Sequence, residues 1–544
     1  MAILGGMKAE LPDIPADERT PAVESLLGFI RPLLDRVVQL EETVQELRDE
    51  IAVLKGLKPK PQIRPSPLEQ PPKPPRADGD KRPGSLKRAK TAALPIQCEV
   101  ILHPPNLPAG AVLKGYEPYV VQELTIAAKN TRYLRARYTL PDGGSVLAPL
   151  PADVLPGRHF GPELMTFILN QVYHARVTQP VLLEQLHDFG IDISAGQLSR
   201  LLTEDHEGFH QEKADVLTTG LAVAEYIGTD DTGARHQGKT GYCTVIRHDL
   251  FTYFESTASK SRVNFLQVLH GGAAIYAIND LATEYWKRQK LAAVVVAALG
   301  TGPTQFADTA AWAARLEELA IIDERHVRLA TEGALLGGLV ERGVSSALVV
   351  LSDGAGQFNV LVHAACWIHA ERPLARLVPH NDDHRQAIEA VRGQIWDFYR
   401  DLKAYRAQPN DAARPALEAR FDALCDQRTG YPSIDGVLKE MRSHRADLLC
   451  VLERPVVPLH NNGSESDIRE YVTKRKISGG TRSASGRQCR DTFASLKKTC
   501  RKLGVRFWDY LRDRVRGLGE VARLPDLIRQ RTQPPKPIGA EPVA

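Results

Sequence analysis

Three acidic residues carry the chemistry that this sequence suggests. The apolar run VAEYIGTDD ends at Asp230, the apolar run SALVVLSDG ends near Asp353, and Glu465 follows the turn sequence HNNGS. Carboxylate oxygens bind hard divalent cations. Two such ions can activate an attacking oxygen and stabilise a leaving one in phosphodiester chemistry. Taken singly, each aspartate is better explained as a turn former, and Glu465 as part of an ordinary surface helix.

Basic residues follow Glu465 in the same segment. We expect Ser464 to cap a helix that carries Glu465 in its first turn, with Arg469 one turn further along. A carboxylate beside a basic face suits metal-assisted chemistry on DNA, because the basic side chains can bind the neighbouring phosphates. The residues of this segment predicted to contact DNA are Arg469, Lys474, Arg475, Lys476 and Arg482.

The elements that position the acids are predicted to form an α/β domain over 221–480. The two aspartate-bearing runs, with TGYCTVIRH and LFTYFES between them, have the apolar character of strands. Ligand-binding groups tend to lie at strand ends in such sheets, so we expect both aspartates where the chain leaves the sheet. Two helical segments, an Ala-rich one at 271–345 and a second at 381–452, are predicted to interrupt the strands.

The N-terminal part is predicted to mediate self-association. Apolar residues from Leu26 to Leu54 alternate at spacings of four and three, which favours a coiled-coil dimerisation helix over 22–56. An amphipathic helix packed on its own domain is the alternative. The Pro-, Lys- and Arg-rich stretch 57–93 is typical of an extended linker, which either touches DNA phosphates or serves only as a solvated tether.

Two smaller modules are expected before the α/β domain. The segments IQCEVIL, YVVQELTI and YLRARYTL predict a small β module over 94–150. Within the helical region 159–210, one helix should end at Gly190 and the next should be capped by Ser194, which fits a helix-turn-helix. Any tight helical hairpin has the same pattern. The outward residues suited to base edges and phosphates are Gln197, Ser199 and Arg200.

Residues 159–515 resemble the bacterial transposases of the insertion-sequence-sixty-six type, members of the acidic-triad (DDE) group with an RNase H-like fold. YIGTDDTGAR, LVVLSDGAGQF and NNGSESDIREYVTKRKISGG resemble the three segments that carry the acids. The resemblance implies that Asp230, Asp353 and Glu465 are catalytic and bind the metal. CWIHAERP resembles the family's Cys-Trp-x-His signature, which we interpret as structural or DNA-positioning. The signature residues implied by these matches are Asp231, Cys366, Trp367, His369, Asn461 and Asn462.

The sequence departs from the family pattern in three places. Family members usually carry a cysteine-rich zinc module after the linker, whereas 94–150 contains only Cys98, so no zinc is expected. His460 stands where the family often has Asp. The connection 271–345 is longer than the resemblance leads us to expect. The remaining chain is predicted to form a C-terminal helical part at 481–520 and a tail at 521–544.

The function implied is a DNA transposase that cleaves strands at the ends of an insertion sequence and joins the freed 3′ hydroxyl to a target. Its cofactor would be Mg²⁺ (or Mn²⁺), as two ions. Its partners would be double-stranded DNA, further copies in a homodimer or higher oligomer, and two small accessory proteins of the element. One rival is a catalytically silent DNA-binding regulator. Another is a different metal nuclease on the same fold, such as a resolvase or an RNA–DNA hybrid hydrolase.

Composition and cysteine usage limit the setting. The 544-residue chain is 43% hydrophobic with a formal net charge of +4, and its seven cysteines are scattered without disulfide or zinc spacing. The N-terminal residues lack the pattern of a signal peptide, and no run of about 18 apolar residues predicts a membrane span. We therefore expect a cytoplasmic, nucleoid-associated protein with no membrane partner.

Overall fold

The computed structural model describes residues 95–532, apart from 109, 152–153, 155–158 and 380, together with residues 20, 23 and 30. Except for residues 23 and 30, the predicted coiled coil and linker lie outside the described residues, as does the end of the predicted tail. The chain divides into two units, 1–123 and 124–544. Every helix and strand considered below belongs to the second unit.

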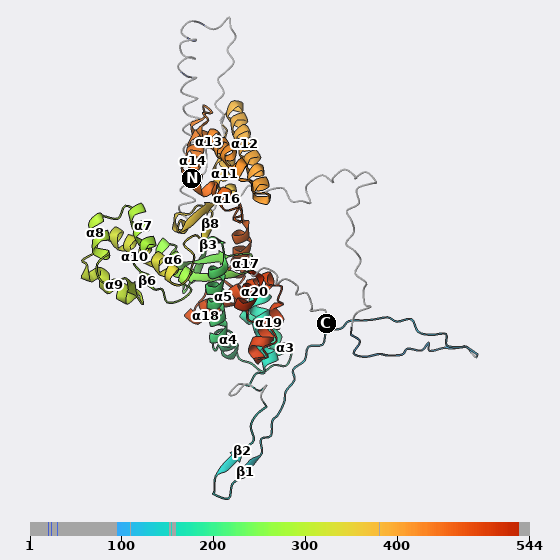
Figure 1. Ribbon diagram of the computed structural model, residues 1–544. Helices are drawn as coiled ribbons and strands as arrows, with labels where there is room; N and C mark the ends of the chain where they lie inside the picture. Colours follow the sequence, from blue (N-terminus) through green and yellow to red (C-terminus); the bar gives the residue numbers. More distant parts are fainter. Residues whose placement is uncertain are drawn as a thin grey trace, which may run out of the picture. The chain divides into compact units, whose positions relative to one another are not determined.

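A five-stranded mixed sheet lies at the centre of the second unit (Figure 1). The strand order is β5-β4-β3-β8-β9. Strand β4 pairs antiparallel with both β3 and β5, whereas β3, β8 and β9 run parallel to one another. The predicted mixed α/β architecture is therefore confirmed, as are the strands expected from TGYCTVIRH, LFTYFES and SALVVLSDG. The strands are β3 Tyr226–His236, β4 Lys239–Arg247, β5 Thr252–Thr257, β8 Val349–Ser352 and β9 Val362–Ala365.

Local sequence explains why the first strands form a hairpin. Gln237 and Gly238 join β3 to β4, and both have positive φ, 49° and 76°. Two consecutive residues of this conformation make the turn whose twist matches that of a hairpin. By contrast, β8 is buried at every position, as expected for a parallel strand covered on both faces. The sheet thus has a buried parallel half and an antiparallel half that extends beyond it.

Helix α18 (Ala484–Lys502) covers the open edge of the sheet at β5. Backbone N–H groups on the outer side of β5 donate to side chains spaced four residues apart on α18. Residues at this spacing share one helix face, so the helix satisfies the donors that an edge strand leaves free. The pairs are Thr252 with Thr499 Oγ1 (3.1 Å), Phe254 with Ser495 Oγ (2.9 Å) and Ser256 with Asp491 Oδ2 (2.8 Å).

The main hydrophobic core lies between the sheet and the helices that precede and follow it. It joins helices from the predicted helical region 159–210 to α5 and to the C-terminal helices. Buried residues such as Phe493 and Tyr510 are among its largest side chains. These helices are α2 Pro162–Leu169, the π-helix η2 Asn170–His174, α3 Gln179–Asp188, α4 Ala195–Thr203, α5 Glu207–Val223 and α19 Phe507–Arg516. Helix α17 (Asn462–Ser478) belongs to a smaller cluster, in which its Ile468 and Tyr471 pack against side chains of β4 and β5.

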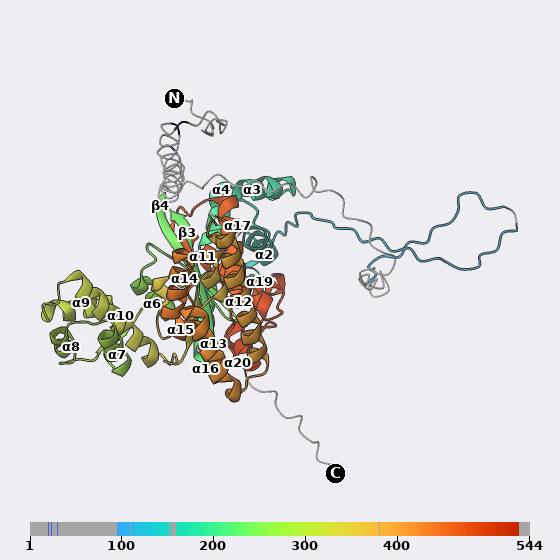
Figure 2. The ribbon, with the colours of Figure 1, turned by 90° about the horizontal axis from the view of Figure 1, so that it is seen from above.

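The segment 271–345 is mostly helical, as predicted, and its helices group together beside α6 (Figures 1 and 2). Helix α10 approaches its neighbours closely because it is rich in glycine: a Cβ at Gly333 would overlap the ring of Trp286. The elements are α6 Arg262–His270, β6 Tyr276–Ala277, α7 Asp280–Arg288, α8 Ala293–Leu299, β7 Gln305–Phe306, α9 Thr309–Glu318 and α10 Glu324–Glu341.

The helices of the predicted segment 381–452 group together (Figure 1), and they have their own hydrophobic core. Trp367, Phe398 and Phe421 lie at the centre of that core. The elements between β8 and α17, besides β9, are η3 Gly356–Phe358, α11 Trp367–Arg376, α12 Asp382–Ala407, η4 Asp411–Ala413, α13 Arg414–Asp426, α14 Pro432–Ser443, α15 Arg445–Leu448 and α16 Cys450–Glu453.

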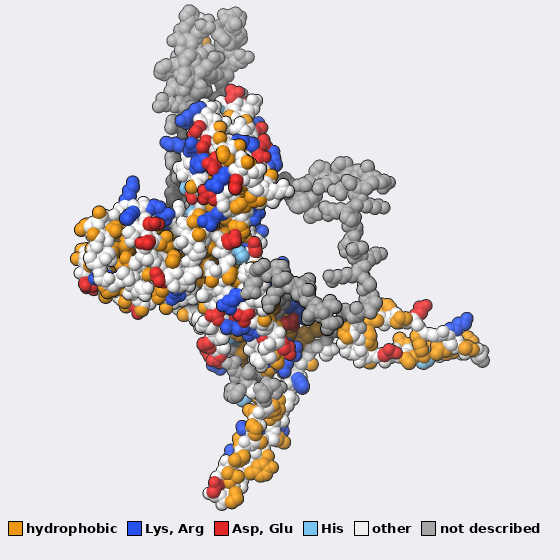
Figure 3. Space-filling view, viewed as in Figure 1, with side chains coloured by type: hydrophobic (Ala, Val, Ile, Leu, Met, Phe, Trp, Pro, Cys, Tyr) orange, Lys and Arg blue, Asp and Glu red, His pale blue; other side chains and the backbone are white. Residues whose placement is uncertain are grey.

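The expected β module over 94–150 is largely absent from its described residues. Only a short hairpin forms, β1 (Arg137–Thr139) with β2 (Ser145–Leu147), and the segments 96–102 and 119–126 contain no strand. Apolar side chains of the hairpin are exposed, including Tyr138 and Val146 (Figure 3). Residues with strand propensity form a sheet only where partner strands bury one face, and these segments have no such cover here.

The prediction of a tail from 521 is wrong for its first half. Residues Leu524–Thr532 form helix α20, whose Leu524 and Ile528 are fully buried against α5. Arg529 and Arg531 then bind Thr219 Oγ1 and the Leu503 carbonyl. The i, i+4 spacing of the two apolar residues is the sequence signal of this helix.

None of the helices in the described part of the chain is both long enough and apolar enough to span a lipid bilayer.

Two glycines inside helices test this packing. A Cβ at Gly220 of α5 would overlap the fully buried ring of Phe251, whereas one at Gly393 of α12 would meet nothing within 4 Å. We expect Gly220→Ala to lower the free energy of unfolding by about 1–3 kcal/mol through overpacking. Gly393→Ala should raise it by about 0.5–1 kcal/mol through helix propensity. Urea unfolding followed by circular dichroism measures both, and equal effects would contradict the packing described here.

Candidate active site

The sheet brings Asp230 and Asp353 to the same level. The parallel pairing of β3 with β8 ends at Gly228 opposite Leu351, and each aspartate follows two residues later in its own segment. Asp353 directly follows β8, as predicted. Asp230 lies inside β3 rather than at a strand end, because β4 continues to pair with β3 as far as His236. The half-buried Asp230 therefore lies where β8 stops, not where its own strand does.

Glu465 reaches the sheet on the first turn of α17. The helix end lies tightly against β3, since a Cβ at Gly228 would come within 2.6 Å of Ser464 Oγ. Ser464 does not cap the helix as predicted: α17 begins at Asn462, after Asn461, and the buried Ser464 hydroxyl donates to Asn461 Oδ1 at 2.6 Å. Because Asn461 holds the capping position, Ser464 serves to pack the helix end on the strand.

Three hydrogen bonds join the segments that carry the acids. The Cys366 N–H donates to the Ser352 carbonyl at 3.0 Å, one residue before Asp353. The Asn461 N–H donates to Cys366 Sγ at 3.2 Å. The Asn461 side-chain amide donates to the Thr229 carbonyl at 2.7 Å, one residue before Asp230. These bonds form a relay, here called the Cys366–Asn461 relay, which fixes the three segments relative to one another.

The signature residues next to Cys366 and Asn461 in the sequence, Trp367 and Asn462, differ in their surroundings. Trp367 is buried and donates through its backbone N–H to the Leu459 carbonyl (3.0 Å) and through Nε1 to the Leu448 carbonyl (2.9 Å). These contacts anchor the chain that leads into α17. Asn462, in contrast, is exposed as the first residue of α17.

Negative charge accumulates at the two strands. Burial raises the pKa of Asp230 to about 7, and the nearby charges of Asp353, Asp231 and Glu465 raise it further against the opposing hydrogen bond from the Asp231 N–H. Burial also raises the pKa of Asp231, while Lys260 and a 2.7 Å hydrogen bond from Gln357 lower it. Asp353 and Glu465 are thus both close enough to Asp230 for their charges to act on it.

His369 and Arg372 of α11 face Glu465. His369 Nε2 lies 3.7 Å and an Arg372 guanidinium nitrogen 4.0 Å from Glu465 Oε1. Burial and then the charge of Arg372 lower the pKa of His369, against the opposing charges of Asp353 and Glu465. His369 was predicted from its signature, but Arg372 was not. Its position three residues after His369 in a helix would have placed both on one face.

The donor chemistry of the site fits hard divalent cations, although the carboxylates are not assembled as ligands. Asp230, Asp353 and Glu465 offer the oxygen donors that Mg²⁺ prefers, and a cation would relieve the repulsion that raises the pKa of Asp230. In the structure Glu465 lies against His369 and Arg372 instead. Within the described ranges, no group of three or more His, Cys, Asp or Glu side chains is arranged to hold a metal ion.

The basic residues predicted after Glu465 separate into two groups. Arg469, Lys476 and Arg482 are exposed. Arg475 is half-buried and donates to Thr232 Oγ1 at 3.1 Å, two residues beyond Asp230 on β3. Lys474 points inward, where Nζ donates to the Val172 carbonyl of η2 at 2.8 Å. A nine-residue separation places Lys474 on the side of α17 opposite Glu465.

The predicted second helix of the helix-turn-helix forms as α4. Its capping by Ser194 is confirmed, with Ser194 Oγ accepting from the Gln197 N–H at 3.2 Å. Gln197 returns its side-chain oxygen to the Ser194 N–H at 2.9 Å, so this oxygen is already engaged. Arg200 is exposed and Ser199 half-buried. Gly190, with φ 79°, makes the turn after α3.

Comparison with known proteins identifies the chain. The family model described as "Transposase IS66 family" matches residues 336–489. The uncharacterized protein y4jO of Sinorhizobium fredii (strain NBRC 101917 / NGR234) is 43% identical over 306 residues, which cover 94% of that protein and 55% of this chain. The chain belongs to the IS66 transposase family. The family match contains Asp353, Glu465 and the signature around Cys366, while Asp230 lies before it.

The raised pKa of Asp230 in this IS66 family protein predicts how the free energy of unfolding depends on pH. The pKa of Asp230 in the folded protein, about 7, exceeds its unfolded value, so ionisation of Asp230 disfavours folding increasingly between about pH 4 and pH 7. Asp230→Asn should therefore raise the free energy of unfolding at pH 8 by about 1–3 kcal/mol, after discounting for solvent exposure, and change it little at pH 4. Urea unfolding at both pH values, in a chelating buffer, measures this.

Asp447→Asn is the matched control. Although burial raises the pKa of Asp447, hydrogen bonds from His363 and His444 lower it below its usual value. The ionised form of Asp447 thus stabilises the fold, and the stabilisation is lost only as the pH falls through the lowered pKa. The control should destabilise the protein at pH 8. Equal behaviour of the two variants would rule out charge repulsion at Asp230.

Proposed function

We propose that this IS66 family protein is a DNA transposase that cleaves strands at the ends of an insertion sequence and transfers them to a target. The observation that carries the proposal is the placement of Asp230, Asp353 and Glu465. Two lie level on adjacent parallel strands, and the Cys366–Asn461 relay ties the third to them. Nothing in the main core requires acids at these positions, so their convergence supports a role in chemistry.

The sheet topology supports an RNase H-like fold for the catalytic domain. The first three strands along the chain form an antiparallel meander, and the fourth and fifth continue from the first as parallel strands. Acids on the first and fourth strands, with a third acid on a later helix, match the arrangement implied by the resemblance of the three sequence segments. The helices α6–α10 and α11–α16 enter as insertions around β8.

Asp230, Asp353 and Glu465 would hold Mg²⁺ or Mn²⁺, as two ions. When bound, these ions would activate the attacking oxygen and stabilise the leaving oxygen of the phosphodiester. Burial and the neighbouring acids raise the pKa of Asp230, so a bound cation would favour its ionisation. His369 and Arg372 hold Glu465 in one orientation. Arg475, which donates a hydrogen bond to Thr232 of β3 near Asp230, would bind a phosphate of the DNA strand that is cleaved.

DNA recognition is assigned to the helices before the sheet. We propose α3 and α4 as a helix-turn-helix in which Arg200, with Ser199 and the free amide of Gln197, contacts DNA. The exposed Arg469, Lys476 and Arg482 would extend the contact along α17 and beyond it. Homodimerisation through 22–56 would hold two element ends together. We also propose that two small accessory proteins of the element take part and that the protein is associated with the nucleoid.

Strand cleavage tests the assignment of the acids. Duplex DNA carrying the sequence that flanks the gene is incubated with the protein and Mg²⁺, with and without the two small accessory proteins proposed above. We expect Asp353→Asn to lower the cleavage rate at the element end by at least about 10³-fold, because acids acting as one unit are individually indispensable. DNA binding should be unchanged, since Asp353 lies outside the predicted DNA-binding groups.

Asp397→Asn, the same substitution at an exposed position of α12, is the control and should cleave like wild type. If Asp353→Asn also cleaves like wild type, the assignment of the acids is wrong. If wild type binds the element end but does not cleave it under any of these conditions, the catalytically silent regulator is the better description.

Metal binding can be measured without DNA. Because a ligand that binds only the folded state stabilises it, 10 mM Mg²⁺ or Mn²⁺ should raise the Tm of wild type by roughly 2–4 °C. The rise should vanish in Asp230→Asn and persist in Asp397→Asn. A rise of the same size in all three proteins would place the bound cation elsewhere.

A further inference from the structure

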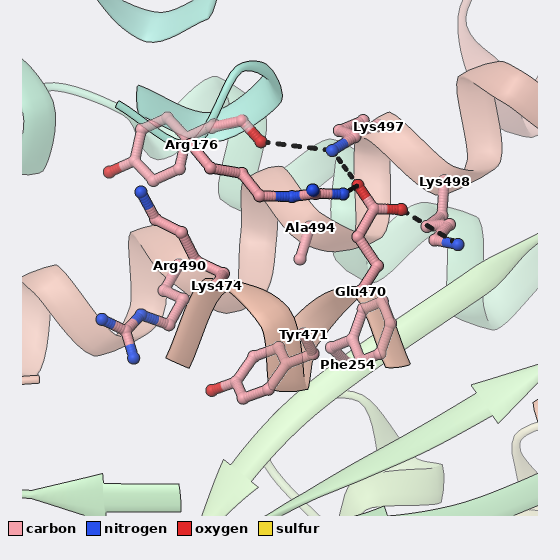
Figure 4. Close-up of a pocket in the computed structure, with 10 residues that line it drawn as sticks. Arg176, Phe254, Glu470, Tyr471, Lys474, Arg490, Ala494, Lys497 and Lys498 are labelled. Carbon is pink, nitrogen blue, oxygen red and sulfur yellow. Dashed lines mark hydrogen bonds and ion pairs between the residues drawn. The ribbon is translucent and has the colours of Figure 1, made fainter. Parts of the chain in front are cut away.

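A basic pocket is lined by residues of η2, α17 and α18 and by Arg176 (Figure 4). Lys474 and Glu470 come from α17, while Arg490 and Lys497 come from α18. Arg176 follows η2. Lys474 is nine residues beyond Glu465 in α17, which puts it about 14 Å further along the axis and on the opposite side. The pocket is therefore distinct from the candidate active site.

Positive charge in the pocket is only partly balanced. Five basic side chains and one acidic side chain, Glu470, line it. Glu470 pairs with Lys497, with Lys498 at 3.0 Å and with Arg176 at 3.4 Å (Figure 4). Despite burial, which acts in the other direction, hydrogen bonds and charges from the two lysines lower the pKa of Glu470 to about 2. The Glu470 carboxylate is thus already paired with three of the five basic side chains.

Lys474 and Arg490 have no acidic partner among the described residues. Lys474 contacts the Val172 carbonyl and Arg490 the Gly479 carbonyl, at 2.8 and 2.9 Å. Burial, followed by the charges of Arg490, Lys497 and Arg176, lowers the pKa of Lys474 to about 8. No carboxylate opposes that shift. An anion entering the pocket would supply the missing charge.

Arg176 adds an unused donor. Its Nε–H is buried and has no hydrogen-bond partner, although its guanidinium reaches Glu470. Arg176 follows the last turn of η2 with φ 67°, the left-handed conformation that commonly ends a helix, and the next N–H, of Val177, donates back to the Gln171 carbonyl at 2.9 Å. The helix end therefore fixes the backbone from which the Arg176 side chain reaches Glu470.

We propose that this pocket binds one phosphate of the DNA backbone, with Lys474 and Arg490 as the principal ligands and Arg176 as a third donor. The cavity, about 30 Å³, is too small for a base and has room for little more than two water molecules. That size suits the oxygens of one phosphate. The inference rests on the proposed function, because DNA is the source of the phosphate.

Binding at this place would join the recognition helices to the catalytic helix. The carbonyls of Val172, Tyr173 and His174 in η2 accept from Lys474 and Lys497. η2 continues from α2 and precedes α3, the first helix of the proposed helix-turn-helix. A phosphate between them would be contacted by side chains of both regions, so DNA held by α3 and α4 would also contact α17.

Salt dependence of DNA binding tests the pocket. Wild type, Lys474→Gln and Arg490→Gln are titrated with a labelled duplex of the element end at several NaCl concentrations, without divalent metal. Each variant should bind about three- to tenfold more weakly, with the slope of log K against log [salt] reduced by about one. Lys439→Gln, which removes an exposed lysine from α14, should leave the slope unchanged.

Thermal unfolding separates binding from a structural role. Because the charge of Lys474 is unbalanced, Lys474→Gln should keep or raise the Tm, and Gln retains a donor for the Val172 carbonyl. A lowered Tm with an unchanged slope would show that Lys474 is only structural. A second arm compares 20 mM inorganic phosphate with chloride at equal ionic strength. A rise in Tm that depends on Lys474, together with unchanged DNA slopes, would assign the pocket to free phosphate and overturn the proposal.

The same titration distinguishes this inference from the proposed function. If wild type fails to bind DNA at all, the proposed function fails and the inference fails with it. If wild type binds and both pocket variants match it in slope and affinity, only the pocket assignment is wrong. Since no metal is present, loss of strand cleavage has no bearing on the result.

Discussion

The hydrogen bonds that meet at Asn461 are the constraint on which the candidate site depends. The three acids are far apart in sequence and lie on elements that different cores support: β3 and β8 on the sheet, and α17 after the separate helical core of α11–α16. One asparagine bonds to the strand before Asp230 and to Cys366, which in turn bonds to the end of β8. A buried amide with fixed partners defines position more strictly than apolar packing does, because leaving either partner unpaired is costly.

Charge is distributed unevenly around α17. On one side of the helix, burial and then the negative charge of the other acids raise the pKa of Asp230. On the other, burial and then the positive charge of the neighbouring basic side chains lower the pKa of Lys474. Binding of a cation near Asp230, or of an anion near Lys474, would therefore favour the charged form of that side chain. One helix thus separates an acidic surface suited to cations from a basic pocket suited to anions, and this separation is what chemistry on a polyanion held by metals requires.

The sequence predicted the elements better than their exact arrangement. Strand-like runs around Asp230 and Asp353 located β3 and β8 because buried strands are continuously apolar. It could not predict that β3 runs on past Asp230, since that depends on pairing with β4. The start of the helix carrying Glu465 was predicted three residues too late, because Asn461 rather than Ser464 takes the capping position. The segments 96–102 and 119–126 have strand propensity but lack partner strands, a property that no single segment encodes. Arg176 and Arg490 gave no local signal, because their pocket combines residues more than 300 positions apart.

The cover that α18 gives to β5 has a consequence for the life of the polypeptide in the cell. The helix that protects this edge is encoded some 230 residues after the strand, so a nascent or prematurely terminated chain presents three unpaired backbone donors on β5. Open edges of this kind recruit strands from other chains and lead to aggregates. The edge of β5 is therefore protected from pairing with other chains only after α18 has been synthesised, at residue 502. Products of the gene that end before α18 should therefore tend to aggregate through this edge.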